Sequence, residues 1–277
     1  MSKMLSRKEI REICAEKNIK PSKRLGQSFL VCEYALKKIT NAAELKKTDF
    51  VIEVGAGLGA LTHALAENTK KVISIEKDKR LAQFVKQRFK EFPNVKIIQN
   101  DILEIEIPNI VGSEEYKLVA NLPFSIATAV IRKFLEVKNP ADTIVVLIQK
   151  EVAQKICAKP PKTNLLAISV QFYAEPKIIS NISKNCFWPQ PKVDSAILKI
   201  IPQKAKYGEI NAKLFFKILK TGFAHPRKQL ANTLYLGLKL EKREIENWTL
   251  KNKIKPQQRP ETLEIMDWIN LTKTFPK

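Results

Sequence analysis

The sequence has few of the residues from which metal centres and disulfide frameworks are built. Its 277 residues include 2 histidines and 4 cysteines, and no two cysteines form a C-x-x-C pair. These residues are Cys14, Cys32, Cys157, Cys186, His63 and His225. The sequence therefore indicates neither a structural zinc site nor a disulfide framework. We expect a protein that uses no metal and works in a reducing compartment.

Long apolar runs are also missing. None approaches the ~20 residues that a transmembrane helix needs. The first residues lead into charged, helical sequence instead of the apolar core of a signal peptide. We therefore expect a cytoplasmic protein with no membrane partner. The content of 44% hydrophobic and 28% charged residues is typical of a globular chain.

The chain has a large excess of positive charge. It carries 49 Lys and Arg against 28 Asp and Glu, a net charge of +21. Residues 1–48 carry 12 basic and 5 acidic groups, residues 49–198 carry 20 and 16, and residues 199–277 carry 17 and 7. A nearly balanced middle between two basic ends favours a catalytic core whose flanks bind a polyanion such as nucleic acid. A solvated, lysine-rich surface is the alternative.

Strand-like and helix-like segments alternate in the first two thirds of the chain. The expected strands are Phe50–Val54, Lys71–Ile75, Val95–Ile98, Lys117–Ala120 and Thr143–Ile148, and the expected helices include Leu61–Glu67 and Asp78–Lys90. This alternation predicts an α/β fold with a parallel sheet and helices on both faces. Beyond Pro202 the pattern is only helical, over Ala212–Thr221, Arg227–Tyr235, Glu241–Trp248 and Thr262–Leu271. We expect a domain over residues 1–202 with a basic helical N-terminal extension, and a small helical domain over residues 203–277.

The glycines are few but clustered. Of 8 in the chain, Gly55, Gly57 and Gly59 directly follow the first expected strand. Glycine permits the tight bend and the close backbone approach of a ligand-binding loop, which opens a helix whose N–H groups face the ligand. An ordinary strand-to-helix turn is the alternative. Gly55-x-Gly57-x-x-Ala60 also fits a dinucleotide fingerprint, with Glu76 placed 21 residues beyond Gly55 as its ribose acid.

Further polar residues stand where the later strands end. Glu76 ends the second strand, Asp101-Ile102 follows the third, and Asn121 begins a tetrapeptide after the fourth. Ligands of open parallel sheets bind at the carboxyl ends of the strands. A nucleoside fits these residues, because Glu76 can accept both ribose hydroxyls, Asp101 the adenine amine, and Ile102 can pack on the ring. For either acid alone, a solvated cap is the alternative.

The tetrapeptide Asn121-Leu122-Pro123-Phe124 has the chemistry to hold an adenine that is being modified. The exocyclic nitrogen of adenine is a poor nucleophile, because its lone pair is delocalised into the ring. The Asn121 side-chain carbonyl and the Leu122 backbone carbonyl can accept its two N–H groups, and Pro123 fixes the turn. Phe124 can stack on an extruded base. An Asn-Pro turn with a core phenylalanine is the alternative.

Together, these motifs resemble the ribosomal RNA adenine N6,N6-dimethyltransferases that modify two adjacent adenines near the 3′ end of small-subunit rRNA. The resemblance extends over almost the whole chain and rests on six segments in the same order. They are Arg24–Leu30, Glu53–Thr62, Asn121–Phe124, Gln149–Ala153, Phe187–Ser195 and Phe223–Leu230. It implies a Rossmann-like methyltransferase sheet with a small helical C-terminal domain, and a role in ribosome biogenesis.

By this resemblance the cofactor is S-adenosylmethionine. The family's cofactor-contacting positions correspond to Ser28, Leu30, Gly55, Glu76, Asp101 and Asn121, and its base-stacking positions to Phe124 and Phe187. Ser28 replaces the family's usual Asn or His, and Phe124 replaces the commoner Tyr. The second change keeps the stacking ring but removes any contribution from a phenol hydroxyl.

The resemblance also implies a partner, the small-subunit rRNA within a pre-ribosomal 30S-type particle, bound by a monomer. Lys213, Lys217 and Lys220 recur at helical spacing, and Arg227 and Lys228 follow closely. We expect Lys220, Arg227 and Lys228 to contact RNA phosphates. A solvated helix face that covers an apolar seam is the alternative.

Three other functions compete with this one. A sister family methylates adenine in large-subunit rRNA and shares the glycine loop and a similar tetrapeptide, but the Phe187–Ser195 segment and Arg227-Lys228 favour the small-subunit group. A ribosome-assembly or transcription factor could keep the fold without catalysis, although the intact Glu76, Asp101 and Asn121 argue against it. A nicotinamide dehydrogenase comes third, because no pattern suggests a hydride-transfer site.

Overall fold

The computed structural model describes residues 4–22, 26–203 and 207–276, and its chain forms two compact units. The first unit contains Met1–Ala153 and Pro176–Pro202, and the second contains Gln154–Glu175 and Gln203–Lys277. Within the described ranges, no helix is long and apolar enough to cross a membrane. Arg24 and Leu25, part of the first segment of the family resemblance, lie outside the described residues.

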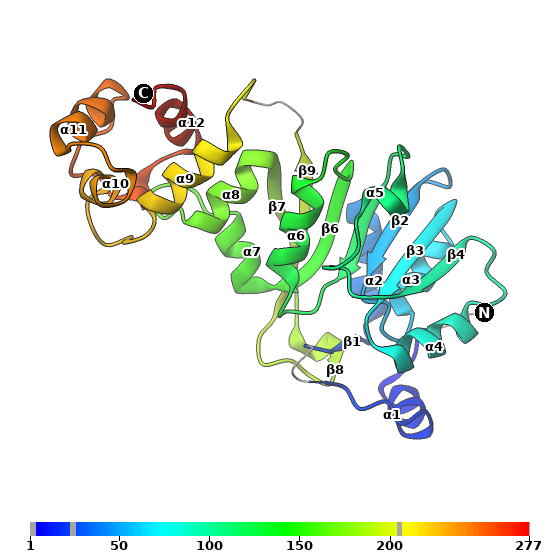
Figure 1. Cartoon of the computed structure of the whole chain (residues 1–277). Coiled ribbons are helices and arrows are strands. Elements are labelled where there is room, and N and C mark those ends of the chain that lie inside the picture. Colours follow the sequence, from blue (N-terminus) through cyan, green and yellow to red (C-terminus); the bar gives the residue numbers. More distant parts are fainter. Residues whose placement is uncertain (1–3, 23–25, 204–206, 277) are drawn as a thin grey trace. The chain divides into compact units, whose positions relative to one another are not determined.

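The first unit is built on a seven-stranded sheet with the order β4-β3-β2-β5-β6-β9-β7 (Figure 1). Its strands are β2 (Phe50–Val54), β3 (Lys71–Glu76), β4 (Val95–Gln99), β5 (Lys117–Asn121), β6 (Thr143–Gln149), β7 (Ala174–Ile182) and β9 (Ser195–Pro202). The five strands from β2 to β6 pair in parallel, as the sequence predicted. The sheet is nevertheless mixed, because β9 pairs antiparallel to β6. Neither β7 nor β9 was predicted.

Helices cover both faces of this sheet. In β6, Val145 and Leu147 pack into a core with α2 (Glu33–Ala43) and α3 (Ala60–Ala66), while Ile144 and Val146, which point to the opposite face, are fully buried as well. The other helices of the unit are α4 (Lys79–Arg88), α5 (Pro108–Val111) and α6 (Ala127–Glu136), and α7 (Lys150–Ile156) follows β6. Asp78, the first residue of the expected helix Asp78–Lys90, is the N-cap of α4 and accepts from the N–H groups of Arg80 and Leu81.

A short second sheet joins distant parts of the chain. The N-terminal helix α1 (Arg7–Glu16), which a Ser6–Glu9 capping box begins, is followed by β1 (Phe29–Leu30). This strand pairs antiparallel with β8 (Phe187–Trp188), which follows the 3-10 helix η1 (Lys184–Cys186). In Figure 1, the two strands lie side by side although their colours are far apart on the bar.

Next to this ladder, Cys32 and Cys186 form a disulfide, with Cα atoms 5.0 Å apart. The expectation that the cysteines form no disulfide is therefore wrong for this pair. The two residues are 154 positions apart in the sequence. The spacing of the cysteines in the sequence does not predict this pair, because it is the β1–β8 ladder that brings Cys32 and Cys186 close together.

The second unit is helical apart from the first residues of β7. It contains α8 (Leu165–Tyr173), α9 (Ala212–Gly222), α10 (Leu230–Leu238), α11 (Lys242–Lys251), η2 (Pro260–Thr262) and α12 (Ile265–Lys273). Its core includes Phe215, Leu234, Trp248 and Trp268, all nearly inaccessible to solvent. The unit shares the expected boundary after residue 202 but also includes residues 154–175. The functional division into residues 1–202 and 203–277 stays a prediction.

Candidate active site

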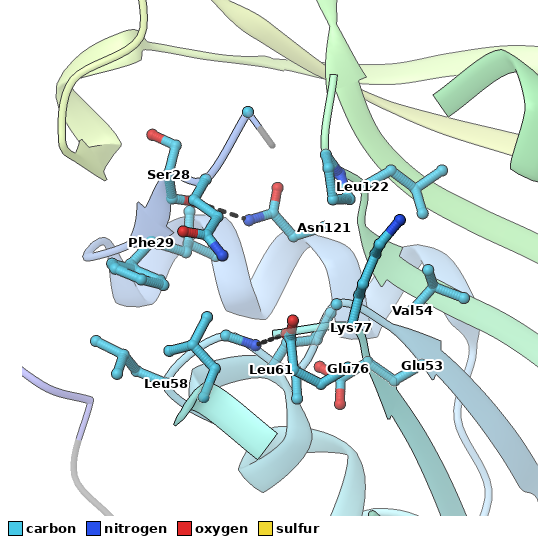
Figure 2. Close-up of a pocket in the computed structure, with 18 of the residues that line it drawn as sticks. Ser28, Phe29, Glu53, Val54, Leu58, Leu61, Glu76, Lys77, Asn121 and Leu122 are labelled. Atoms are coloured by element: carbon cyan, nitrogen blue, oxygen red, sulfur yellow. Dashed lines mark hydrogen bonds between the residues drawn. The ribbon is translucent and has the colours of Figure 1, made fainter. Parts of the chain in front are cut away.

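The carboxyl ends of the parallel strands open into one pocket. It is lined by every residue that the sequence predicted to bind the cofactor or the target base, which are Ser28, Leu30, Gly55, Glu76, Asp101, Ile102, Asn121, Leu122, Pro123, Phe124 and Phe187. Figure 2 shows Glu76 and Lys77 at the end of β3, and Asn121 and Leu122 at the end of β5. The fold therefore brings these residues together, while the role of each stays a prediction.

The glycine loop holds the Glu76 carboxylate. The Gly57 N–H donates to Oε2 of Glu76 at 3.0 Å, and the Asp78 N–H donates to Oε1 at 2.9 Å (Figure 2 draws the first of these bonds). Burial raises the pKa of Glu76, and the two N–H donors oppose this rise by stabilising the charged form. Each oxygen keeps a second lone pair. The carboxylate is thus fixed in place and can still accept from ribose hydroxyls.

Two glycines of the loop adopt a backbone conformation that other residues disfavour, and both have a ring close to where a Cβ would stand. Gly57 and Gly59 have φ angles of 55° and 84°, in the left-handed region. A Cβ at Gly57 would lie 3.3 Å from the Phe29 ring, and one at Gly59 would lie 2.5 Å from the Phe89 ring. The loop therefore passes the pocket with bare backbone, which fits the close approach of a nucleoside cofactor.

Asp101, the expected acceptor of the adenine amine, already has two hydrogen-bond donors. Lys77 Nζ lies 2.5 Å from its Oδ2, and the Leu103 N–H donates to its Oδ1 at 3.0 Å. The Lys77 ammonium, followed by the Leu103 N–H, lowers the pKa of Asp101. Ile102, which is 3% exposed, lines the same part of the pocket. Lys77 was not among the predicted pocket residues, although it directly follows Glu76.

The Asn121 carboxamide is oriented by the β1 segment. Its Nδ2 donates to the backbone carbonyl of Ser28 at 3.2 Å, so the amide oxygen is the atom that remains for an incoming donor (Figure 2). The Ser28 hydroxyl itself donates to the Pro189 carbonyl at 2.5 Å. Ser28 thus acts on the site through its backbone, in a way that its residue type did not indicate.

The two predicted stacking rings have different surroundings. Phe124 is half-buried at the pocket, and its backbone passes close to Gly26, where a Cβ would lie 3.1 Å from the Phe124 nitrogen. Phe187 also lines the pocket, but it is 1% exposed and belongs to the core that α2 forms with the sheet. Phe124 is therefore the ring with more freedom to contact a base, and Phe187 forms part of the pocket wall.

Glu53, another lining residue, has no assigned role in the sequence analysis. Its Oε2 accepts from the Thr62 and Ser74 hydroxyls, each at 2.6 Å, while no described residue donates to its buried Oε1. Burial raises the pKa of Glu53 to about 7, despite these hydroxyl bonds. The sequence did contain a sign that Glu53 is unusual. It is a single carboxyl residue near the end of an apolar strand, directly before the glycine loop.

The RNA-contact candidates lie in the helical unit and are exposed. Lys220 stands in the last turn of α9, and Arg227 and Lys228 stand in the loop before α10. The predicted helix over Arg227–Tyr235 is shorter at its start, because Gln229 takes the N-cap position of α10. Phe215, Ile218 and Leu219 of α9 are buried, so the exposed lysines do border an apolar seam.

In the described part of the chain, no three His, Cys, Asp or Glu residues form a metal-binding group.

The buried Glu53 predicts a pH effect on folding. Its folded pKa of about 7 exceeds its ordinary value of 4.5, so the folded chain holds more protons than the unfolded chain between these values. Stability therefore falls as pH rises through this window and levels off above it. Relative to Glu53→Gln, the wild-type chain should lose about 3 kcal/mol of unfolding free energy between pH 4 and pH 8. Denaturant titrations across this range measure the difference, and parallel curves for the two proteins would contradict it.

The chain is similar in sequence to a known protein family. The sequence matches the family model described as ribosomal RNA adenine dimethylase over residues 18–276. The ribosomal RNA small subunit methyltransferase A of Dehalococcoides mccartyi (strain CBDB1) is 43% identical over 265 residues, which cover 95% of this chain and 91% of that protein. The protein of the same name from Clostridium acetobutylicum is 38% identical, covering 95% of this chain and 96% of that protein.

Two solved structures are similar to the whole fold. A dimethyladenosine transferase from Plasmodium falciparum matches with a TM-score of 0.76 and 26% identity, covering 89% of this chain and 97% of its own. The 23S rRNA methyltransferase ErmE matches with a TM-score of 0.73 and 24% identity, covering 90% of this chain and 100% of its own. The second likeness concerns the fold alone.

Proposed function

The chain belongs to the ribosomal RNA adenine dimethylase family, and from this premise we propose that it dimethylates the N6 amines of two adjacent adenines near the 3′ end of small-subunit rRNA. Membership confirms the resemblance, the S-adenosylmethionine dependence and the rRNA adenine dimethyltransferase activity that the sequence implied. The two adjacent adenines and their position in the rRNA are the proposal. The dehydrogenase and the non-catalytic factor are not favoured by any of these relatives.

The pocket residues fit the nucleoside end of the cofactor. S-adenosylmethionine supplies a methyl group that its sulfonium already activates. Glu76, held by two backbone N–H groups, would accept the ribose hydroxyls, and Asp101 would accept the adenine amine beside Ile102. Ser28, Leu30 and Gly55 would contact the cofactor through the loop and the β1 segment. Asn121, at the end of β5, would then lie between the cofactor and the target base.

The orientation of Asn121 is the observation that supports methyl transfer to an adenine amine, and the small-subunit relatives support the choice of rRNA. Because Ser28 O accepts from its Nδ2, the carboxamide oxygen is directed to accept from a target amine. The Leu122 carbonyl would accept the second N–H, with Pro123 fixing the turn. Two acceptors on one amine localise its lone pair and align it with the methyl group, and alignment is the main contribution required. Phe124 would stack on the flipped base, and Phe187 would form part of the pocket wall.

The helical unit and the basic N-terminus would bind the RNA backbone. Residues 199–277 carry 17 basic against 7 acidic groups, more positive charge than a cofactor site needs. Lys220, Arg227 and Lys228 would contact phosphates and so position the rRNA for the catalytic pocket. The partner we propose is a pre-ribosomal 30S-type particle, bound by a monomer in the cytoplasm.

Methyl transfer to purified ribosomal subunits tests the function directly. Unmethylated small subunits incubated with labelled cofactor and the protein should yield N6,N6-dimethyladenosine on nucleoside analysis. A primer-extension stop should then locate two adjacent modified adenines near the 3′ end of the small-subunit rRNA. Modification of large-subunit rRNA instead would favour the sister family, and the absence of transfer to either rRNA would refute the proposal.

The orientation of Asn121 predicts a catalytic defect on its removal. Asn121→Ala removes the acceptor oxygen, and by comparison with other lost transition-state hydrogen bonds the turnover should fall about 100-fold or more. The affinity for rRNA should change little, because phosphate contacts dominate it. Single-turnover methylation and filter binding measure the two effects. Near-normal turnover in the variant would eliminate the catalytic role.

Glu76 makes a prediction about the cofactor. Glu76→Ala should weaken the binding of S-adenosylhomocysteine by about 1–3 kcal/mol, because hydrogen bonds to a charged acceptor are lost. Isothermal titration calorimetry gives the dissociation constants. Glu104→Ala, which removes an exposed acid near the same strand ends, is the matched control and should bind normally. Equal affinity of Glu76→Ala and the wild-type chain would leave Glu76 as a structural cap of the glycine loop.

The basic residues predict a change in salt dependence. Replacing Lys220, Arg227 and Lys228 together by Gln should weaken rRNA binding and lower the slope of log K against log salt by up to ~0.9 per lost phosphate contact. A triple Gln variant at Lys242, Arg243 and Lys251, which are exposed on α11, removes the same charge elsewhere in the unit. If both variants change the slope equally, net charge and not these three positions explains the binding.

A further inference from the structure

A lysine is paired with Asp101, the proposed acceptor of the cofactor's adenine amine. Lys77 Nζ lies 2.5 Å from Oδ2 of Asp101, and the Leu103 N–H donates to Oδ1, so each oxygen accepts one hydrogen bond and the ammonium also neutralises the carboxylate charge. Lys77 and Asp101 both line the pocket. Figure 2 shows the Lys77 side chain extended from the end of β3 beside Glu76. An adenine amine that enters this end of the pocket therefore meets an acceptor with a competing donor.

The two partners of this ion pair differ in their exposure to solvent. The Asp101 side chain is 14% exposed, whereas the Lys77 side chain is 60% exposed. The carboxylate is thus held by the protein, and the ammonium can exchange the pair for water by rotating its flexible stem. Because the ammonium side of the pair is largely exposed, water screens the pair and keeps it weak. Lys133 is another cation near Asp101. Its Nζ donates to the Leu103 carbonyl at 3.0 Å, so Lys77 is the lysine that pairs with the carboxylate.

We propose that Lys77 competes with the adenine amine for Asp101 and thereby weakens the binding of both S-adenosylmethionine and S-adenosylhomocysteine. The inference rests on the proposed role of Asp101 as the adenine acceptor. A carboxylate that is neutralised by an ammonium is a weaker acceptor for the uncharged N–H of adenine, so the cofactor must displace Lys77 or share Asp101 with it.

Weaker binding has a use in this reaction. Each dimethylated adenine takes two methyl groups, so the enzyme must release S-adenosylhomocysteine and bind new S-adenosylmethionine between the transfers. A cation that returns to Asp101 stabilises the pocket without its cofactor and so favours release. Lys77 is therefore inferred to set the rate of cofactor exchange, without touching the reacting atoms.

The test compares cofactor binding by Lys77→Met and the wild-type chain. Methionine keeps the aliphatic stem and removes the charge. S-adenosylhomocysteine, which carries no net charge, should bind Lys77→Met up to about fivefold more tightly, the upper end of what a water-screened ion pair contributes, and dissociate more slowly. Lys79→Met removes an exposed positive charge two residues away and should bind like the wild-type chain. Unchanged or weaker binding by Lys77→Met would overturn the inference.

Two further arms make the effect specific. S-inosylhomocysteine has an oxygen in place of the 6-amino group, so Lys77→Met should not bind it more tightly, and an equal gain for both ligands would overturn the inference. In an Asp101→Asn background, Lys77→Met should have no further effect, and a gain that persists there would also overturn it. If the wild-type chain failed to bind S-adenosylhomocysteine at all, the adenine site itself would be wrong, together with the inference.

Discussion

The in-register pairing of the parallel strands is the constraint on which the site depends. β2 pairs with β3 as far as Val54↔Ile75, and β3 pairs with β4 as far as Glu76↔Gln99. Since side chains alternate between the faces of a strand, a shift of one residue in β3 would turn Glu76 to the other face. Its carboxylate would then no longer meet the Gly57 N–H. The hydrophobic contacts on both faces, by fixing the register, also fix the position of Glu76, the proposed ribose acceptor.

The second wall of the pocket comes from the β1–β8 ladder and not from the large sheet. Pairing of Leu30 with Phe187 brings the N-terminal segment to the pocket, where the Ser28 carbonyl orients Asn121. The Ser28–Pro189 hydrogen bond and the Cys32–Cys186 disulfide tie the same two segments together on either side of the ladder. The orientation of the Asn121 side chain therefore depends on contacts between residues that lie more than 150 positions apart.

This division explains what the sequence could predict. Strands β2 to β6 are short apolar runs whose identity is local, so their positions and the residues at their ends followed from pattern and turn chemistry. The β1–β8 ladder is two residues long on each side and has no local signature. Strand β9 is a largely apolar run of eight residues that was missed, and its antiparallel pairing with β6 could not be read from that run. The disulfide, the buried Glu53 carboxyl and the Lys77–Asp101 pair are contacts of the folded chain. The sequence shows which residues are present, but it does not show which of them contact each other in the folded chain.

The arrangement of acceptors at Asn121 suits a reaction that takes place twice on one nitrogen. After the first transfer the amine carries a methyl group and a single N–H, so one acceptor is enough to orient it, and the other faces the methyl group. Phe124, which has no hydroxyl, offers an apolar surface at this place.

A methylated exocyclic amine of adenine is a very weak base and loses its extra proton readily to water, so neither Glu53 nor Glu76 is needed as a general base. Glu53 is instead committed to the hydroxyls of Thr62 and Ser74, and Glu76 to the glycine loop. In the proposed mechanism, the acids of the pocket would therefore hold the cofactor and the fold, and the carbonyl groups of Asn121 and Leu122 would hold the reacting amine.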